Sequence, residues 1–86
     1  LNVMINNAGV MCAEREKTAE GFNRVIATNY LGPFLLTNLL LPLLKQTPES
    51  RIISVSSVVH WWGRIDLNDL NLEKDHPWIT WTGSKL

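Results

Sequence analysis

The stretch Arg51-Ile52-Ile53-Ser54-Val55-Ser56-Ser57 decides how the rest of the chain is interpreted. Ile52 to Ser56 predict a short strand, because β-branched residues favour strands and a turn-forming run at 47–50 precedes them. Apolar residues do not alternate strictly here, which is typical of a parallel strand covered on both faces. In open α/β sheets, ligands bind beyond the carboxyl ends of the strands. The hydroxyls of Ser56 and Ser57 are therefore expected at such an end, although a polar turn would also explain a Ser-Ser pair.

Upstream, a second strand is predicted at Leu1–Ile5, and the run Asn6-Asn7-Ala8-Gly9 leaves its carboxyl end. Thr18 is a candidate N-cap for a helix that begins near Ala19. Apolar residues then follow helical spacing, and Asn29 lies on the same stripe. A buried amide must find hydrogen-bond partners, so Asn29 is equally well explained as a structural link between two elements.

Helix is predicted to continue or resume through Phe34–Lys45, where leucines cover almost the whole circumference. Such a helix must be buried against other parts of the protein or against a partner. Pro42 should kink or break it. The apolar stretch Leu31–Leu44 is shorter than the ~20 residues that a membrane-spanning helix needs, so no span is expected in this segment.

After Ser57, the residues Val58–Lys74 predict a long irregular connection, and a last helix is expected to begin near Pro77 or Trp78. The order is then strand, helix, strand, loop, helix. A helix between two such strands favours a parallel pair. The chain is therefore expected to have an α/β fold and to form part of a single domain.

Composition excludes several classes of function. The chain has 86 residues, no net formal charge and 45% hydrophobic residues, so neither disorder nor nucleic-acid binding is indicated. A single cysteine, Cys12, allows no internal disulfide. Cys12, His60 and His76 lack the spacing of metal ligands, so no metal site is predicted.

The chain resembles the short-chain dehydrogenase/reductase family in the order and spacing of its motifs, which are Asn6-Asn7-Ala8-Gly9, Asn29, Ser56-Ser57 and Ser84-Lys85. The stretches 27–37 and 51–63 are similar to the retinol dehydrogenase-like branch of that family. The resemblance implies a doubly wound, Rossmann-like parallel sheet that binds NAD or NADP, with NADP slightly favoured by the branch. The five glycines never form the family's Gly-rich phosphate loop. Residues 1–86 would then be the central part of one NAD(P)-binding domain, without that loop and without the C-terminal part.

The resemblance also implies roles for single residues. Asn7-Ala8-Gly9 would lie beside the adenosine half of the cofactor, and Asn29 would hold a water in a proton relay. Ser57 would hydrogen-bond the oxygen of the substrate. Lys85 would bind the hydroxyls of the nicotinamide ribose and lower the pKa of a neighbouring phenol.

The residue that would carry this phenol is different here. The family pattern is Tyr-x-x-x-Lys, whereas this chain has Trp81-Thr82-Gly83-Ser84-Lys85. A tyrosine hydroxyl can exchange a proton when a cation lowers its pKa, but an indole N–H is only a donor. Trp81 thus occupies the position of the family's catalytic tyrosine.

Two interpretations of function follow. The chain is a segment of an oxidoreductase that transfers hydride between NAD(P) and an alcohol or carbonyl on a retinoid-, steroid- or lipid-like substrate, although the segment alone is expected to be inactive. Alternatively it is a truncated product or pseudoenzyme that at most binds cofactor or a partner. A hydrolase using Ser57 and His60 is a distant third, because no Gly-x-Ser-x-Gly elbow is present. The family further implies a homodimer through the leucine-rich helix and a cytoplasmic or endoplasmic-reticulum-associated location.

Overall fold

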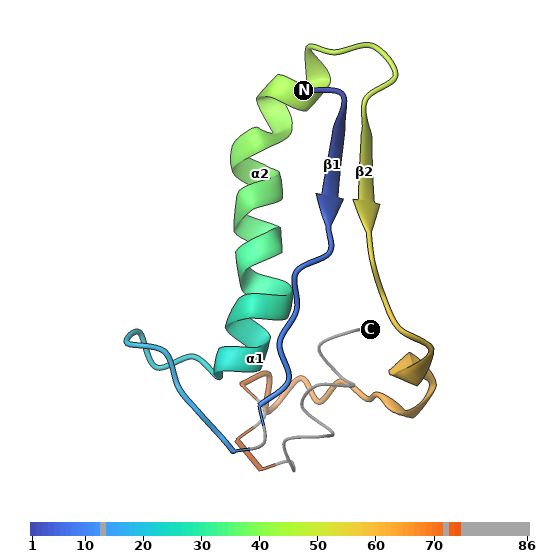
Figure 1. Ribbon diagram of the computed structural model, residues 1–86. Helices are drawn as coiled ribbons and strands as arrows, with labels where there is room; N and C mark the ends of the chain where they lie inside the picture. The colour runs from blue at the N-terminus through green and yellow to red at the C-terminus, as the bar shows by residue number, and fades with distance from the viewer. Residues whose placement is uncertain (13, 72, 75–86) are drawn as a thin grey trace.

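The computed structural model describes residues 1–12, 14–71 and 73–74. Two strands and one long helix form its frame. The strands are β1 (Val3–Asn6) and β2 (Arg51–Ser54), and the helix has two α-helical parts, α1 (Arg24–Ile26) and α2 (Gly32–Lys45). A π-helical stretch, Ala27–Leu31, joins α1 to α2, and a 3₁₀ helix, Val58–Trp62, follows β2. Both strands run in one direction and the helix returns beside them in the other (Figure 1). The strand–helix–strand order predicted from sequence is therefore confirmed.

The two strands pair in parallel, with Val3 opposite Arg51 and Asn6 opposite Ser54. Both strands differ from the predicted ranges, Leu1–Ile5 and Ile52–Ser56, by one or two residues at each end. The end of β2 is set by its neighbour, because the backbone N–H of Val55 donates to the carbonyl of Asn6 at 2.9 Å and β1 goes no further. The hydrogen bonds between two strands end where the shorter partner ends. The sequence of one strand alone therefore does not show this boundary.

The predicted start of the first helix was wrong. Thr18 does not cap a helix; its backbone carbonyl accepts from the N–H of Gly21, whose φ is 91°, and closes a turn. The helix begins at Arg24, and its N-cap is Asn23, whose side-chain oxygen accepts from the N–H groups of Val25 and Ile26. Asparagine caps helices at least as well as threonine. The glycine in the left-handed region cannot belong to the helix, which moves its start by about one turn.

Proline explains why the long helix widens into a π turn in its first half. Pro33 has no N–H, and its ring would clash with the carbonyl of Asn29, four residues earlier. The N–H of Gly32 instead donates to the carbonyl of Ala27, five residues back. A Cβ at Gly32 would lie 3.2 Å from this carbonyl oxygen, so a glycine suits the close approach. Isolated π turns inside α-helices often occur at functional sites, and this one contains Asn29.

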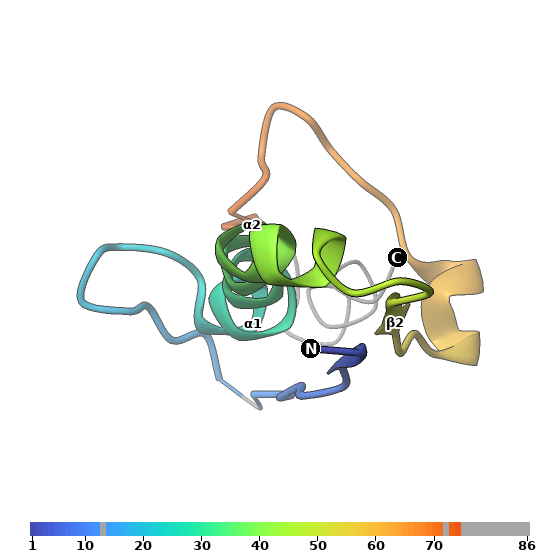
Figure 2. The ribbon, with the colours of Figure 1, turned by 90° about the horizontal axis from the view of Figure 1, so that it is seen from above.

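Pro42 does not break the helix, which continues to Lys45. The continuous helix Arg24–Lys45 has 22 residues, and its most apolar 18-residue window has a mean hydropathy of 1.3, so by length and composition alone it could cross a membrane. The sequence-based argument against a span counted only the shorter stretch Leu31–Leu44. Length and composition do not assign the helix to a membrane, because core helices of soluble proteins pass the same test. The helix α2 runs alongside the strand pair (Figure 1), and β2 lies beside it when the chain is viewed from above (Figure 2).

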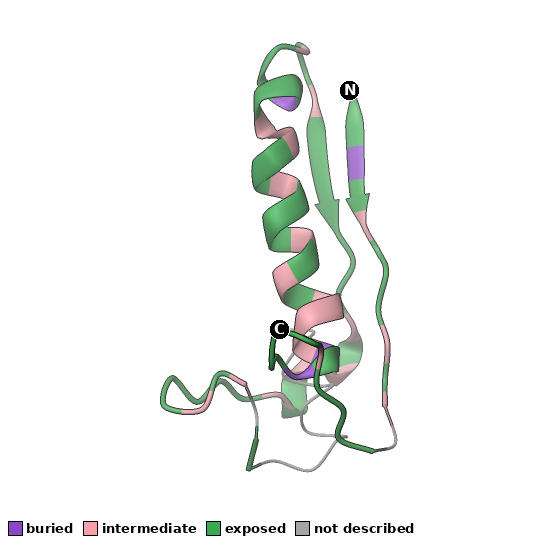
Figure 3. Cartoon of the chain, turned by 90° about the vertical axis from the view of Figure 1, so that its left-hand side faces the viewer, coloured by how far each residue is buried: buried purple, intermediate pink, exposed green. Residues whose placement is uncertain are grey.

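The core of the described residues is small. Met4 on β1, Val25 on α1 and Leu44 on α2 are its buried hydrophobic residues. Most of α2 and both strands are exposed, as Figure 3 shows, and Leu39 keeps 67% of its surface accessible. The expected cover on both faces of β2 is thus not supplied by the described residues, because Ile52 and Ile53 are both exposed. The homodimer expected through the leucine-rich helix stays a prediction, which sedimentation of the full-length protein would check.

Candidate active site

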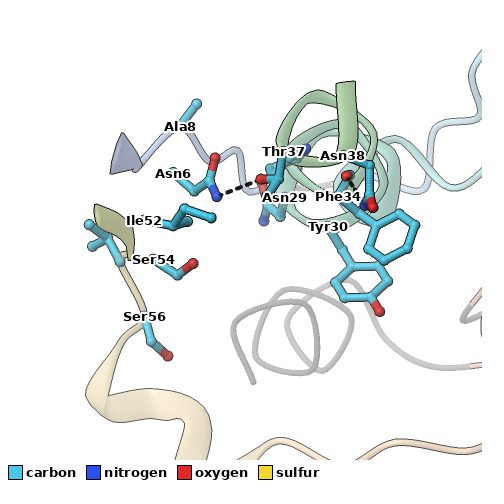
Figure 4. Close-up of a pocket in the computed structure, with 12 residues that line it drawn as sticks. Asn6, Ala8, Asn29, Tyr30, Phe34, Thr37, Asn38, Ile52, Ser54 and Ser56 are labelled. Carbon is cyan, nitrogen blue, oxygen red and sulfur yellow. Dashed lines mark hydrogen bonds between the residues drawn. The ribbon is translucent and has the colours of Figure 1, made fainter. Parts of the chain in front are cut away.

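The carboxyl ends of β1 and β2 lie side by side and open onto a cavity of about 440 Å³ (Figure 4). Polar and aromatic side chains from both strand ends and from the long helix surround it. Its lining residues are Asn6, Ala8, Asn29, Tyr30, Pro33, Phe34, Thr37, Asn38, Ile52, Ser54, Val55 and Ser56. A cavity at this edge of a parallel sheet is where α/β proteins bind ligands.

A hydrogen bond joins β1 to α2 across this cavity. The side-chain amide of Asn6 donates to the hydroxyl of Thr37 at 3.1 Å, as drawn in Figure 4. The contact spans 31 positions in the sequence. It fixes how far the end of β1 stands from the helix and therefore helps to set the width of the cavity.

Asn29 joins the helix to the segment that leaves β1. Its side-chain oxygen accepts from the backbone N–H of Val10 at 2.7 Å, and its amide donates to the carbonyl of Val10 at 3.0 Å. The side-chain amide of Asn29 thus pairs with both the N–H and the carbonyl of Val10, as a backbone peptide group does in a strand pair. The structure thus confirms the interpretation of Asn29 as a structural link. Its role in a proton relay stays a prediction, and its position in the cavity lining is compatible with that role.

We expect the substitution Asn29→Ala to lower the free energy of unfolding of the full-length protein by about 2 kcal/mol, because it leaves the N–H and carbonyl of Val10 without these partners. Asn29→Asp keeps the acceptor for the Val10 N–H but faces the Val10 carbonyl with a second acceptor oxygen, so it should destabilise the protein as well. Asn38→Ala is the matched control, because among the described residues the Asn38 amide bonds only to the Phe34 carbonyl of its own helix, at 2.8 Å. Chemical denaturation measures all three variants. Equal losses for Asn29→Ala and Asn38→Ala would contradict the expectation.

The two serines that follow β2 occupy different environments. Ser56 lines the cavity, whereas Ser57 is the N-cap of the 3₁₀ helix and its side-chain oxygen accepts from the N–H of Val59 at 3.4 Å. The Nδ1 atom of His60 bonds to the carbonyl oxygen of Ser57 at 2.6 Å and not to its hydroxyl. A nucleophile and its base must be hydrogen-bonded to each other. The geometry around Ser57 therefore gives no support to the hydrolase interpretation.

Of the remaining predicted site residues, some are described by the structure and others are not. Ala8 lines the cavity, and Asn7 and Gly9 are exposed on either side of it in the chain. Trp81 and Lys85 lie outside the described residues, as does the helix predicted near Pro77 or Trp78. The cofactor contacts of Asn7, Ala8, Gly9 and Lys85 stay predictions.

Sequence reasoning expected Ser56 at this strand end but missed other residues of the cavity, among them Ser54 and Tyr30. Ser54 and Ser56 lie two positions apart on β2 and its continuation, so the period of a strand places them on one side with Ile52. Tyr30, the only tyrosine, also lines the cavity and stacks on Phe34 with ring centroids 6.2 Å apart. The alternation along β2 could have identified Ser54, because its two-residue spacing from Ser56 is visible in the sequence.

Asn71 holds the segment after the 3₁₀ helix against the start of α1. Its side-chain oxygen accepts from the backbone N–H of Asn23 at 2.6 Å, and its amide donates to the carbonyl of Gly21 at 3.2 Å. Nearby, hydrogen bonds from the Lys17 ammonium and then from Asn71 lower the pKa of Glu73. Asn71 and Glu73 are thereby held near the start of the helix that carries Asn29. Sequence analysis predicted a loop here but not this contact.

Comparisons with known proteins agree with this geometry. A sequence model of the family described as short chain dehydrogenase matches residues 1–66. Human retinol dehydrogenase 11 is 54% identical over 74 residues, which cover 86% of this chain and 23% of that protein. Dehydrogenase/reductase SDR family member 13 from Bos taurus is 46% identical over 81 residues, covering 94% of this chain and 20% of that protein. The chain thus spans less than a quarter of the length of these curated relatives.

A solved structure shows the same fold. The crystal structure of an uncharacterized protein from Mycobacterium paratuberculosis superposes with a TM-score of 0.82 at 45% identity and covers 98% of this chain and 31% of its own. The Rossmann-like parallel fold that the motifs implied is therefore confirmed. From the matched residues and this superposition, the chain belongs to the short-chain dehydrogenase family and is similar to its retinol dehydrogenase branch.

Proposed function

We propose that the full-length protein containing this segment is an NAD(P)-dependent oxidoreductase that acts on an alcohol or carbonyl group. The observation that carries the proposal is the cavity at the carboxyl ends of β1 and β2, lined by Asn29 and Ser56 in a short-chain dehydrogenase fold. In the reductive direction a hydride passes to the carbonyl carbon and a proton to its oxygen, so that an alcohol and oxidised cofactor form.

The residues present suit part of a nicotinamide dinucleotide. Ala8 and Gly9 carry little side-chain bulk where the chain leaves β1, which allows a flat ring system to approach the backbone. The cofactor supplies the hydride, and the residues of this chain hold and polarise the substrate. The hydroxyl of Ser57 would donate to the substrate oxygen, and Asn29 would hold a water that passes protons. Lys85 would bind the ribose and lower the pKa of a phenol at position 81. NADP is the slightly favoured cofactor.

A lipophilic substrate fits the apolar part of the cavity. Tyr30, Pro33, Phe34 and Ile52 contribute carbon surface to its lining. Retinol is named in the descriptions of several relatives, so retinoid, steroid and other lipid-like alcohols or aldehydes are the classes that we propose. Such substrates partition into membranes, and we propose association with the endoplasmic reticulum rather than a cytoplasmic location. Fractionation of cells that express the full-length protein would test this.

Deuterium transfer tests the activity directly. The full-length protein, with Trp81 and with Trp81→Tyr, is incubated with an aldehyde and with NADPH or NADH that carries deuterium at both C4 positions. We expect one carbon-bound deuterium in the alcohol, slowly with Trp81 and faster with tyrosine, because mass spectrometry detects even a few turnovers. Retinoid, steroid and aliphatic aldehydes are compared.

The alternative, an inactive relative, predicts a different result. A pseudoenzyme would bind cofactor without transferring deuterium while Trp81 is in place. Because the substitution of the family tyrosine by Trp81 is the feature that favours inactivity, the unmodified protein decides between the two: transfer with Trp81 in place supports the oxidoreductase, and transfer by the Trp81→Tyr form alone supports the inactive relative. No transfer by either form to any aldehyde of the panel would refute the proposed function.

A further inference from the structure

The imidazole of His60 is bonded to the backbone of Ser57. Its Nδ1 atom lies 2.6 Å from the carbonyl oxygen of Ser57, and the backbone N–H of His60 donates to the same oxygen at 3.0 Å. His60 is half-buried, and its ring packs against that of Trp61 with centroids 5.8 Å apart. The ring and the backbone N–H of His60 thus occupy both lone pairs of the backbone carbonyl oxygen of Ser57.

This contact determines which nitrogen of His60 carries the proton. A carbonyl oxygen can only accept hydrogen bonds, so Nδ1 must be the donor and carry hydrogen. In the neutral ring Nε2 is then the unprotonated nitrogen. Ordinary histidines in water exchange between the two forms, whereas this bond selects one of them. A short bond to a half-buried carbonyl also restrains the ring itself.

The side chain of Ser57 is held from the same 3₁₀ helix. Its oxygen accepts from the N–H of Val59 at 3.4 Å, which uses one lone pair. Within residues 1–12, 14–71 and 73–74 this side chain has no further hydrogen-bond partner, so its O–H and second lone pair can meet a substrate. A substrate carbonyl could accept from this O–H, and a substrate alcohol could donate to the remaining lone pair. The first turn of the 3₁₀ helix therefore orients both the carbonyl and the hydroxyl of Ser57.

We propose that His60 is a positioning residue for Ser57, and that its Nδ1–H bond to the Ser57 carbonyl keeps the serine hydroxyl aligned with the oxygen of the substrate. The proposal rests on the proposed function, because it assigns the substrate contact to Ser57. His60 itself touches no reacting atom. A group that sets the orientation of a catalytic side chain affects the rate more than it affects cofactor binding.

Variants of the full-length protein in the Trp81→Tyr background test the rate. His60→Leu removes the donor and should lower kcat about tenfold, the worth of one ordinary hydrogen bond, with KM for the cofactor unchanged. His60→Asn places an amide donor at the position of Nδ1 and should restore kcat to within about threefold, since most of that bond is regained. His60→Gln places its amide donor one bond further from the backbone than Nδ1 and should not restore kcat. Trp62→Leu, an exposed residue of the same 3₁₀ helix, is the control that leaves kcat unchanged.

A second measurement needs no activity. In protein labelled with ¹⁵N-histidine, at about pH 8 where the ring is ordinarily neutral, Nδ1 of His60 should give the shift of a protonated nitrogen and Nε2 that of an unprotonated one. The signal is assigned by its loss in His60→Asn. If the Trp81→Tyr protein transfers no hydride, the proposed function fails and this spectrum alone decides the bond. A protonated Nε2, full kcat in His60→Leu, or equal losses in His60→Asn and His60→Leu would each overturn the proposal.

Discussion

Replacing Trp81 by tyrosine in the full-length protein should raise kcat/KM for carbonyl reduction by about 10²–10⁴-fold, the range that general acid–base catalysis contributes. The motif at this position is Trp81-Thr82-Gly83-Ser84-Lys85, and indole offers no group that exchanges a proton near neutral pH. A phenol at position 81, four positions before Lys85 as in the family motif, would have its pKa lowered by the cation. The rate is measured with NADPH and NADH against lipophilic aldehydes.

Three further variants separate proton transfer from other causes of the gain. Trp81→Phe supplies a ring without the hydroxyl and should give no gain, whereas relief of steric blocking would make it equal to Trp81→Tyr. Lys85→Met, added to Trp81→Tyr, should remove most of the gain. Tyr30→Phe tests whether the phenol of Tyr30, which already lines the cavity, supplies the residual activity of the unmodified protein. Full activity of the unmodified protein would refute the assignment of position 81 to proton transfer.

Removing the hydroxyl of Ser57 should have the second-largest effect. In the Trp81→Tyr background, Ser57→Ala should lower kcat about 10²–10³-fold, as the loss of one donor to a developing oxyanion does. The side-chain oxygen of Ser57 is already held by the N–H of Val59, so its O–H needs little reorganisation to meet a substrate. Ser57→Thr keeps a hydroxyl and should retain more activity than Ser57→Ala.

The neighbouring serine makes this prediction sharper. Ser56 lines the cavity, while Ser57 was assigned the substrate contact from the family's motif. We expect Ser56→Ala to lower kcat less than Ser57→Ala does, and steady-state kinetics of both variants compares them. If the order is reversed, Ser56 is the donor, and the inference that His60 acts through Ser57 loses its basis.

Several features of the fold could be predicted from sequence because they depend on residues close together in the chain. The run around Ile52 and Ile53 and the strand near Val3 are visible in their β-branched and apolar residues. The helix between them follows from its leucines, and a helix between two strands favours parallel pairing. The start of the helix was less predictable. Asn23 and Thr18 are both residue types that cap helices, and only the turn at Gly21 decides between them.

Sequence alone determined the α/β class, the parallel strand pair and the family, since these rest on local patterns and on the order of short motifs. The tertiary structure decided what the polar side chains do. Asn29 could have been a structural link or a functional group until its two bonds to Val10, 19 positions away, were seen. The contact of Asn71 with Asn23 spans 48 positions. Such bonds form only after the backbone has brought distant donors and acceptors within about 3 Å with correct direction, and no pattern within a short stretch carries that information.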